Sequence, residues 1–375
     1  MVMSKRPLDV DVYTLAKERV RKAFEMFDEV RVQFSGGKDS SAVLNVTLEV
    51  AHELGKLPVK VDFWDEEVIS PDTVDYVRRV SQRPDVELRW LCVPLKHPNA
   101  CSRREPWWYQ WDPADQWRWA RELPPEAVTH EDLGWRVEDV REIDIFHSAV
   151  LLCQDDSKTY GLLLGIRAEE SIARYWRVAH RQEDNWITPS QAKPNVYLCR
   201  PIYDWTVRDI WTATYKFGWD YNRSYDKMTK LGVPMRQQRV TVPFHQLTYV
   251  TTWYFPKIWP EFWERALDRV PGARAAVLYN HTSLYSGIGR PKEGYTWQDL
   301  IRYYLNRWPP RERKILADYI QSLIRSHYRY RKGPIPEDEP GYTVTWKRLA
   351  LIAKQGDFEK RNTMYTMVRS GEGEL

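Results

Sequence analysis

The chain has 375 residues and a formal net charge of +4, which is too mild for its length to indicate nucleic-acid binding by itself. It has no apolar run long enough for a membrane span, and its first residues lack the apolar segment of a signal peptide. The four cysteines are scattered without a Cys-x-x-Cys pair, which argues against a zinc ribbon or an iron–sulfur cluster. We therefore expect a cytoplasmic protein with no membrane partner.

Apolar residues along the first part of the chain alternate between the helical and the strand period. This alternation predicts helices at 9–28, 40–54 and 70–82, and strands at 30–34, 59–64 and 86–93. Residues 97–140 interrupt it with many tryptophans, prolines and charged side chains, which we interpret as an insertion. The later predicted elements are a helix at 142–154, strands at 160–166 and 196–202, and a largely helical pattern from residue 221 onward.

Strands and helices that alternate in this way form parallel sheets joined by right-handed crossovers. We therefore expect an α/β fold with an open parallel five-stranded sheet and helices on both faces. The Trp-rich insertion and a mainly helical C-terminal region would be added to this sheet. Ligands of such sheets lie beyond the carboxyl ends of the strands, so residues that follow the strands are the candidates for function.

Residues 35–41 read Ser-Gly-Gly-Lys-Asp-Ser-Ser and join the first predicted strand to a helix. Gly36 and Gly37 let the backbone turn tightly and leave no side chain in the way of a ligand. The first amides of the helix and its dipole favour an anion, and Lys38 adds a positive charge. Hydroxyl groups come from Ser35, Ser40 and Ser41. The stretch predicts a phosphate-binding loop; a glycine-rich turn that only connects the two elements is the alternative.

This loop is not the common P-loop, because that motif requires a glycine five residues before its Gly-Lys pair, where this chain has Val32. Ser-Gly-Gly-Lys-Asp-Ser instead resembles the PP-loop of the ATP pyrophosphatases. The resemblance implies a loop that holds the β,γ-pyrophosphate of ATP. It also implies cleavage between the α- and β-phosphates.

A second cluster, residues 165–174, follows the strand predicted at 160–166 and reads Gly-Ile-Arg-Ala-Glu-Glu-Ser-Ile-Ala-Arg. Gly165 would permit close backbone approach, and Arg167 and Arg174 could bind phosphate. An ordinary strand–helix junction with a solvated charged face would explain the spacing equally well. The order Gly-x-Arg-x-x-Glu-Ser followed by an arginine, however, resembles a signature of the phosphoadenylylsulfate (PAPS) reductases.

Two further stretches resemble the same superfamily: Phe63 to Thr73, and Pro201-Ile-Tyr-Asp-Trp-Thr-Val-Arg-Asp-Ile-Trp211. All four stretches occur in the family's order. The resemblance implies a PP-loop nucleotide-binding domain at 30–220, with an N-terminal helix at 1–29 and a helical region at 221–375.

The departures from the reductases concern cysteine. Their C-terminal Glu-Cys-Gly-x-His stretch supplies the attacking thiol, whereas the last cysteine here is Cys199. Glu105-Pro-Trp-Trp108 and Leu231-Gly-Val-Pro-Met-Arg-Gln-Gln-Arg239 resemble the IbrA-like branch, which carries a DUF3440 C-terminal region. That resemblance implies a regulator found with a ParB-like partner. The missing C-terminal cysteine, for its part, argues against reduction by a thiol of this chain.

Asp39 and Asp65 follow the first two predicted strands and are candidate Mg²⁺ ligands, since this ion prefers hard oxygen donors. Either aspartate could instead cap a helix. Lys38, Asp39 and Arg167 are the candidate catalytic residues, because the two cations would neutralise charge on departing pyrophosphate. The predicted nucleotide-binding set is Ser35, Gly36, Gly37, Lys38, Asp39, Ser40, Ser41, Gly165, Arg167 and Arg174.

Two aromatic stretches leave nucleic-acid binding open. Residues 107–119 contain five tryptophans, which could form a stacking platform for a base but which we favour as packing of the insertion against the sheet. Residues 302–332 hold nine Lys or Arg residues against two acids, interleaved with tyrosines. Basic charge with aromatic rings suits nucleic acid, although a solvated helix face is the commoner explanation.

Together these patterns predict an ATP pyrophosphatase that uses ATP and Mg²⁺, releases AMP and pyrophosphate, and adenylates or activates an acceptor for group or sulfur transfer. One alternative is a protein that binds PAPS or adenylylsulfate and performs sulfur chemistry with an external thiol. The other is a nucleotide-sensing, DNA-associated regulator that acts with the ParB-like partner. The sequence indicates neither the acceptor nor the oligomeric state.

Overall fold

The computed structural model describes most of the chain and divides it into two compact units. The described residues are 9–99, 101–102, 104–143, 145–170, 186–235, 237–244, 253–278, 291–331, 333–339, 342 and 344–358. Unit 1 comprises 1–95, 110–114 and 122–241, and unit 2 comprises 96–109, 115–121 and 242–375. Both units are therefore built from stretches that are separated in sequence.

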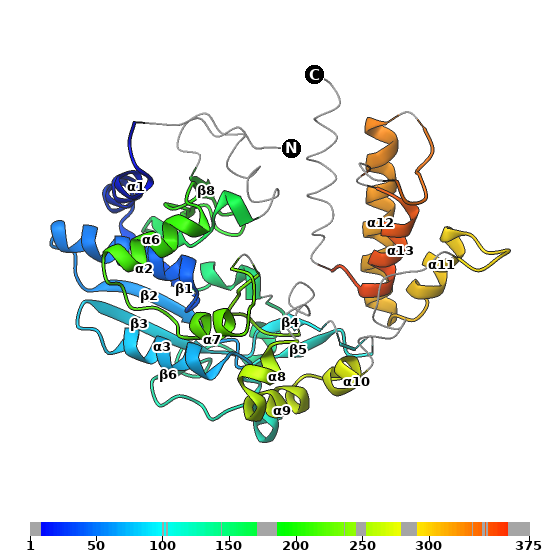
Figure 1. The fold of residues 1–375 in the computed structure, drawn as a ribbon, viewed down its shortest axis with the longest axis horizontal. Coiled ribbons are helices and arrows are strands. Elements are labelled where there is room, and N and C mark those ends of the chain that lie inside the picture. The colour runs from blue at the N-terminus through cyan, green and yellow to red at the C-terminus, as the bar shows by residue number, and fades with distance from the viewer. Residues whose placement is uncertain are drawn as a thin grey trace. The chain divides into compact units, whose positions relative to one another are not determined.

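Unit 1 is an α/β fold around a seven-stranded sheet with the order β6-β3-β2-β1-β7-β9-β8, as Figure 1 shows in part. Its strands are β1 (Glu29–Phe34), β2 (Val59–Trp64), β3 (Val86–Cys92), β6 (Ala127–Thr129), β7 (Tyr160–Leu164), β8 (Ile187–Pro189) and β9 (Val196–Cys199). Neighbouring strands are parallel except for β8 and β9. The predicted α/β class is confirmed, and the five predicted strands are β1, β2, β3, β7 and β9. The two edge strands β6 and β8 were not expected, because three residues are too few for a periodic pattern.

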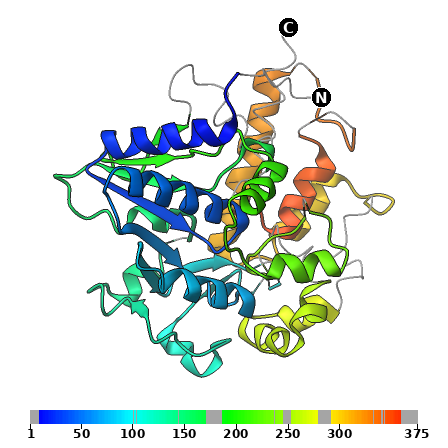
Figure 2. The same ribbon diagram turned by 60° about the vertical axis from the view of Figure 1, so that its left-hand side comes forward.

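One face of this sheet is apolar and carries long helices. Val32, Val61 and Phe63 are almost fully buried on it. The helices of unit 1 that accompany the sheet are α1 (Val12–Met26), α2 (Lys38–Glu53), α3 (Pro71–Ser81) and α6 (Val207–Lys216). Figures 1 and 2 show α1, α2 and α3 one beside the next. The predicted start of α3 is confirmed, since the Ser70 side chain accepts a hydrogen bond from the amide of Thr73, and Pro71 is the first helical residue.

The opposite face carries charge at its centre. Asp62 is fully buried and accepts hydrogen bonds from the guanidinium groups of Arg31, at 2.7 and 2.8 Å, and of Arg89, at 2.8 Å. Burial would raise the pKa of Asp62, but the two arginines hold it below its ordinary value. Apolar residues around Cys153 and Val140 cover the flanks of this face.

The strand order places a topological switch point at the centre of the sheet. The chain proceeds from β1 to β2 and β3 on one side, and then returns to β7 on the other side of β1. The connections that leave β1 and β7 therefore diverge at their carboxyl ends, where ligands of open parallel sheets bind. Residues 35–41 follow β1 and residues 165–170 follow β7.

Unit 2 is mainly helical, as predicted for the C-terminal region. It contains the antiparallel pair β4 (Lys96–Pro98) and β5 (Trp107–Tyr109). Its helices are α8 (Phe255–Ile258), α9 (Pro260–Arg269), α10 (Ala273–Leu278), α11 (Trp297–Leu305), α12 (Pro310–Tyr330) and α13 (Trp346–Gln355). Helices α11, α12 and α13 share one apolar cluster that includes Ile301, Ile320 and Leu349. Over the part of the chain that the structure describes, every helix is too short or too polar to cross a membrane.

The Trp-rich insertion supplies both buried and exposed rings. Trp111 is buried, and its indole N–H donates to the carbonyl of Asp65, directly after β2, at 2.9 Å. Trp108 is buried within unit 2, where its ring stacks on that of His97. Trp117 is largely exposed. The five tryptophans of this stretch therefore do not form a single platform.

Candidate functional site

The loop after β1 turns through two glycines into the first turn of α2. Gly36 has a φ of +70°, in the left-handed region that disfavours other residues. Gly37 is the N-cap of α2 and brings no capping side chain, so the first helical amides are left to other partners. Among the described residues, the amides of Asp39 and Ser40 have no hydrogen-bond acceptor. These amides can therefore donate to an anion.

The serines of the loop hold its own backbone together. Ser40 Oγ accepts from the amide of Ser35 at 3.1 Å and donates to the carbonyl of Gly37 at 3.0 Å. Ser41 Oγ donates to the same carbonyl at 2.8 Å and accepts from the hydroxyl of Tyr76 at 2.9 Å. These contacts hold the loop in its turn. The contacts to a phosphate that the sequence predicts for the serines would come in addition.

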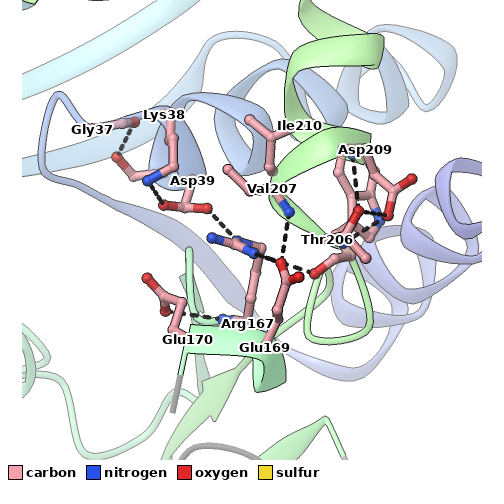
Figure 3. Close-up of polar contacts among 12 residues, drawn as sticks. Gly37, Lys38, Asp39, Arg167, Glu169, Glu170, Thr206, Val207, Asp209 and Ile210 are labelled. Carbon is pink, nitrogen blue, oxygen red and sulfur yellow. Dashed lines mark hydrogen bonds and ion pairs between the residues drawn. The ribbon is translucent and has the colours of Figure 1, made fainter. Parts of the chain in front are cut away.

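The carboxylate of Asp39 lies between two cations, as Figure 3 shows. Lys38 Nζ is 3.1 Å from one of its oxygens, and the Nε–H of Arg167 donates to the other. The side chains of Lys38 and Arg167 are 9% and 4% exposed. The structure thus brings together all three predicted catalytic residues, which come from two connections separated by more than a hundred residues.

Burial lowers the pKa of Lys38 below its ordinary value, and the positive charges of Arg167 and Arg239 lower it further, while Asp39 opposes the shift. A buried ammonium group with two further cations near it is costly to keep charged. A second anion at this position would therefore gain more affinity here than it would beside an exposed lysine.

Gly165 allows the end of β7 to lie against the first turn of α2. A Cβ atom at this residue would be 2.5 Å from the amide nitrogen of Ser40 and 2.7 Å from the carbonyl carbon of Asp39. Both atoms belong to backbone, which cannot move aside cheaply. The close approach predicted for Gly165 is therefore present, and it directs the following Arg167 toward Asp39.

Arg167 is oriented by the two acids that follow it. Its Nη1 donates to Glu169 at 2.9 Å, and the same carboxylate oxygen accepts from the amide of Val207, at the start of α6, at 2.8 Å. The amide of Arg167 donates to Glu170 at 3.4 Å. These contacts are drawn in Figure 3. Glu169 and Glu170, which the sequence analysis left without a role, thus position the arginine. The predicted Arg174 lies outside the described residues.

Two residues that the sequence analysis missed support the loop from the segment after α6. Asn222 is buried, and its Nδ2 donates to the carbonyl of Gly36 at 3.0 Å and to Thr73 Oγ1 at 2.8 Å. The hydroxyl of Tyr225 accepts from the amide of Lys38 at 3.0 Å. Both residues lie more than 180 positions from the loop in sequence, so no local pattern indicated these contacts.

Asp65 is in a different position from Asp39. It is fully buried, and its oxygens accept from the indole N–H of Trp90 at 2.6 Å and from the amide of Glu67 at 2.9 Å. Its neighbour Glu66 is half-buried, and burial, with the charge of Asp65, raises the pKa of Glu66 to about 7. This turn after β2 is held by hydrogen bonds from neutral donors.

The residues around α2 fit a polyphosphate, since free amides and two buried cations converge there. Within the described ranges, no group of three or more His, Cys, Asp or Glu side chains is arranged to hold a metal ion. Mg²⁺ on a nucleotide needs only one or two carboxylates, because phosphate oxygens and water supply its other ligands. Asp39 fits that part, whereas the role of Asp65 as a metal ligand stays a prediction.

The four cysteines are poor nucleophiles. Cys92, Cys153 and Cys199 are buried, and burial raises the pKa of Cys153 to about 11 and that of Cys199 to about 12. Cys101 is half-buried, and burial raises its pKa to about 12. Because the thiolate is the reactive form, none of them is activated for attack.

Comparisons with known proteins give the family. Residues 29–233 match the phosphoadenosine phosphosulfate reductase domain, and residues 232–369 match a domain of unknown function, DUF3440. The chain is 28% identical over 389 residues to the uncharacterized protein YbdN of Escherichia coli (strain K12), covering 99% of this chain and 94% of that protein. It is 23% identical over 284 residues to the uncharacterized protein MJ0973 of Methanocaldococcus jannaschii, covering 73% of this chain and 55% of that protein.

The similar solved structures are more distant. The PAPS reductase of Candida auris has a TM-score of 0.35 and 13% identity, covering 64% of this chain and 97% of that one. The U34-tRNA thiolase NcsA of Methanococcus maripaludis has a TM-score of 0.33 and 12% identity, covering 76% and 85%. The assignment rests on the sequence match instead. Since the reductase domain matches more than half of the 375 residues, the chain belongs to the phosphoadenosine phosphosulfate reductase domain family.

Proposed function

We propose that the chain binds ATP at the start of α2 and cleaves it between the α- and β-phosphates. The observation that carries this proposal is the position of Asp39, whose carboxylate is bound by both Lys38 and Arg167. A polyphosphate that reaches the free amides of α2 offers both cations stronger anionic partners. Asp39 then becomes available to hold a Mg²⁺ ion, which would supply positive charge beside the phosphates.

The attacking group comes from the acceptor in this proposal, because Cys92 is buried and burial raises the pKa values of Cys101, Cys153 and Cys199, which keeps these three thiols protonated. An acceptor oxygen forms a bond to the α-phosphorus, and the bond from that phosphorus to the α,β-bridging oxygen breaks. The electron pair of the broken bond leaves with pyrophosphate. Lys38 and Arg167 stabilise the charge that develops on it.

The test is incubation of the protein with ATP labelled at the α-phosphate, Mg²⁺ and candidate acceptors, followed by separation of the products. We expect labelled AMP or an adenylated acceptor together with pyrophosphate, and loss of both in Lys38→Ala. Lys60→Ala is the matched control, since Lys60 is 40% exposed and pairs with Glu29 on the opposite face of the sheet. Labelled ADP as the product would contradict the proposal.

A second candidate is PAPS, because the matching domain is that of the PAPS reductases. The same loop would then hold the nucleotide phosphates, and an external thiol would have to perform the sulfur chemistry. Calorimetry with ATP and with PAPS separates the two candidates. A strong preference for PAPS without pyrophosphate release from ATP would replace the first proposal with the second. ATP binding without turnover would instead favour a nucleotide sensor.

A further inference from the structure

Helix α12 has an outer side that carries most of its charge. Leu316, Ile320 and Leu323 are buried on its inner side, in the cluster shared with α11 and α13. On the other side, exposed residues recur every three or four positions and so form one continuous stripe. This stripe, called the α12 face below, consists of Lys314, Asp318, Gln321, Arg325, Tyr328 and Arg329.

The cations of the α12 face lack the acidic partners that solvated helix faces usually have. Among the described residues, Lys314, Arg325 and Arg329 form no ion pair. Arg274 in the same unit is exposed as well, but it pairs with Glu264 at 2.9 Å and with Asp268 at 2.6 Å. Like charges that repel one another along a helix cost stability unless an anion lies beside them.

An exposed ring lies among these cations. Tyr328 is 56% exposed, and it lies directly before Arg329 and three residues after Arg325. Its ring meets the ring of the buried His327 edge-on, with 5.2 Å between ring centroids, and more than half of the tyrosine stays open to solvent. A partly fixed aromatic ring between arginines is suited to stacking on a base.

The length of the face also suits a polymer. Lys314 and Arg329 are fifteen residues apart, or about 22 Å along a helix that rises about 1.5 Å per residue. A nucleic-acid strand carries one phosphate per nucleotide and so presents several phosphates over this distance. A free nucleotide or inorganic phosphate would contact only one end of it.

We propose that the α12 face binds single-stranded nucleic acid, with Arg325, Arg329 and Lys314 on phosphates and Tyr328 stacked on a base. The proposal does not depend on the reaction proposed for the loop after β1. Unpaired bases are required because the ring needs an accessible base plane, which a duplex does not offer.

Fluorescence anisotropy with labelled oligouridylate and oligothymidylate of about 20 nucleotides tests it, at about 50 mM salt and above. The full-length double variant Arg325→Ala/Arg329→Ala should bind at least 10-fold more weakly than wild type. Its plot of log affinity against log salt should be shallower by about 1.4, since each phosphate contact on a single strand contributes about 0.7. The control Arg265→Ala/Arg274→Ala removes the same charge from α9 and α10 and should change affinity less than twofold.

Tyr328→Ala should weaken binding at least fivefold, whereas Tyr328→Phe, which keeps the ring, should bind as wild type does. Thermal unfolding of each variant verifies that it folds. The proposal is overturned if wild type does not bind, if both double variants lose affinity equally, or if duplex DNA binds more tightly than the single strands. Equal binding to vesicles of anionic lipid, unaffected by Tyr328→Ala, would also overturn it and would indicate a membrane surface instead.

Discussion

Asp39 and Asp65 follow neighbouring strands of one sheet, and the sequence predicts both as metal ligands, yet their surroundings differ. The partners of Asp39 are the cations Lys38 and Arg167, which a phosphate could take over. Asp65 instead accepts hydrogen bonds from the indole of Trp90 and from the backbone amide of Glu67, which are neutral donors fixed by the fold. An acid at the end of a strand can thus form ion pairs that a ligand could replace, or it can accept hydrogen bonds that hold a turn in place.

The difference between Asp39 and Asp65 depends on phosphate binding by Lys38. The substitution Lys38→Ala is therefore the strongest test. We expect nucleotide affinity to fall 100-fold or more, on the order of the effect of removing one preorganised donor to developing charge. Lys60→Ala, measured beside it by calorimetry, should keep wild-type affinity. Equal affinities for wild type and Lys38→Ala would show that the ammonium group serves only the loop.

Replacing each aspartate in turn separates exchangeable from fixed partners. Asp39→Ala leaves Lys38 without its carboxylate, and Asp65→Ala leaves the buried indole N–H of Trp90 without an acceptor. Each change should lower the free energy of unfolding by about 2–3 kcal/mol. In urea unfolding without Mg²⁺, added pyrophosphate should reduce the difference in unfolding free energy between wild type and Asp39→Ala. The reason is that pyrophosphate replaces the negative charge of the missing carboxylate. Pyrophosphate should leave the difference between wild type and Asp65→Ala unchanged. If it instead stabilised Asp65→Ala and not Asp39→Ala, Asp65 would be the acid with exchangeable partners.

The loop of Asp39 also depends on Asn222, a residue distant in sequence whose side chain donates to the carbonyl of Gly36. Asn222→Ala removes the donor to Gly36 and leaves that carbonyl unpaired, which should cost about 2 kcal/mol of unfolding free energy. Asn45→Ala is the control, since the half-buried Asn45 makes one hydrogen bond, to the carbonyl of Ser41. Chemical unfolding should show a smaller loss for the control, and equal losses would argue against a special role of Asn222.

The smallest expected effect concerns Glu66, beside Asp65. Its folded-state pKa of about 7 lies above the ordinary value of 4.5, so the unfolded chain releases this proton at lower pH than the folded one. Its contribution to stability should therefore be full below pH 4.5 and fall as pH rises to 7. Because the side chain keeps some contact with solvent, we expect a fall of about 1 kcal/mol rather than the full linkage value.

Glu66→Gln should remove this part of the pH dependence, measured by urea unfolding between pH 5 and pH 8. The exposed Glu87, changed to Gln on β3, controls for the loss of one negative charge. Parallel pH curves for wild type and Glu66→Gln would mean that Glu66 titrates like an acid in water.

Much of unit 1 could be predicted, because its signals are local. Strands β1, β2 and β3 and the start of α3 follow directly from periodicity and capping, and Gly36-Gly37-Lys38 indicates an anion loop without knowledge of the fold. The support of that loop could not be predicted in the same way. Asn222 lies 186 residues from the Gly36 that it holds, and no periodic pattern encodes such a contact.

The role of Asp65 was difficult to infer for a related reason. Its sequence neighbourhood resembles that of a ligand-binding acid, but its partner Trp90 belongs to another strand and lies 25 residues away. The state of Cys101 was likewise set by surroundings rather than by the polar residues next to it in sequence. Local chemistry indicated the candidate site, whereas the partners of each acid depend on tertiary contacts that the sequence does not show.

The interleaved division of the chain has a consequence for synthesis. Residues 96–109 and 115–121 belong to unit 2, but the rest of that unit begins only at residue 242. On the ribosome, β4 and β5 therefore emerge more than a hundred residues before the helices that complete their unit. A fragment that ends at residue 241 would keep residues 96–109 and 115–121 without the rest of their unit. For expression of unit 1 alone, a short linker should therefore replace each of these two segments.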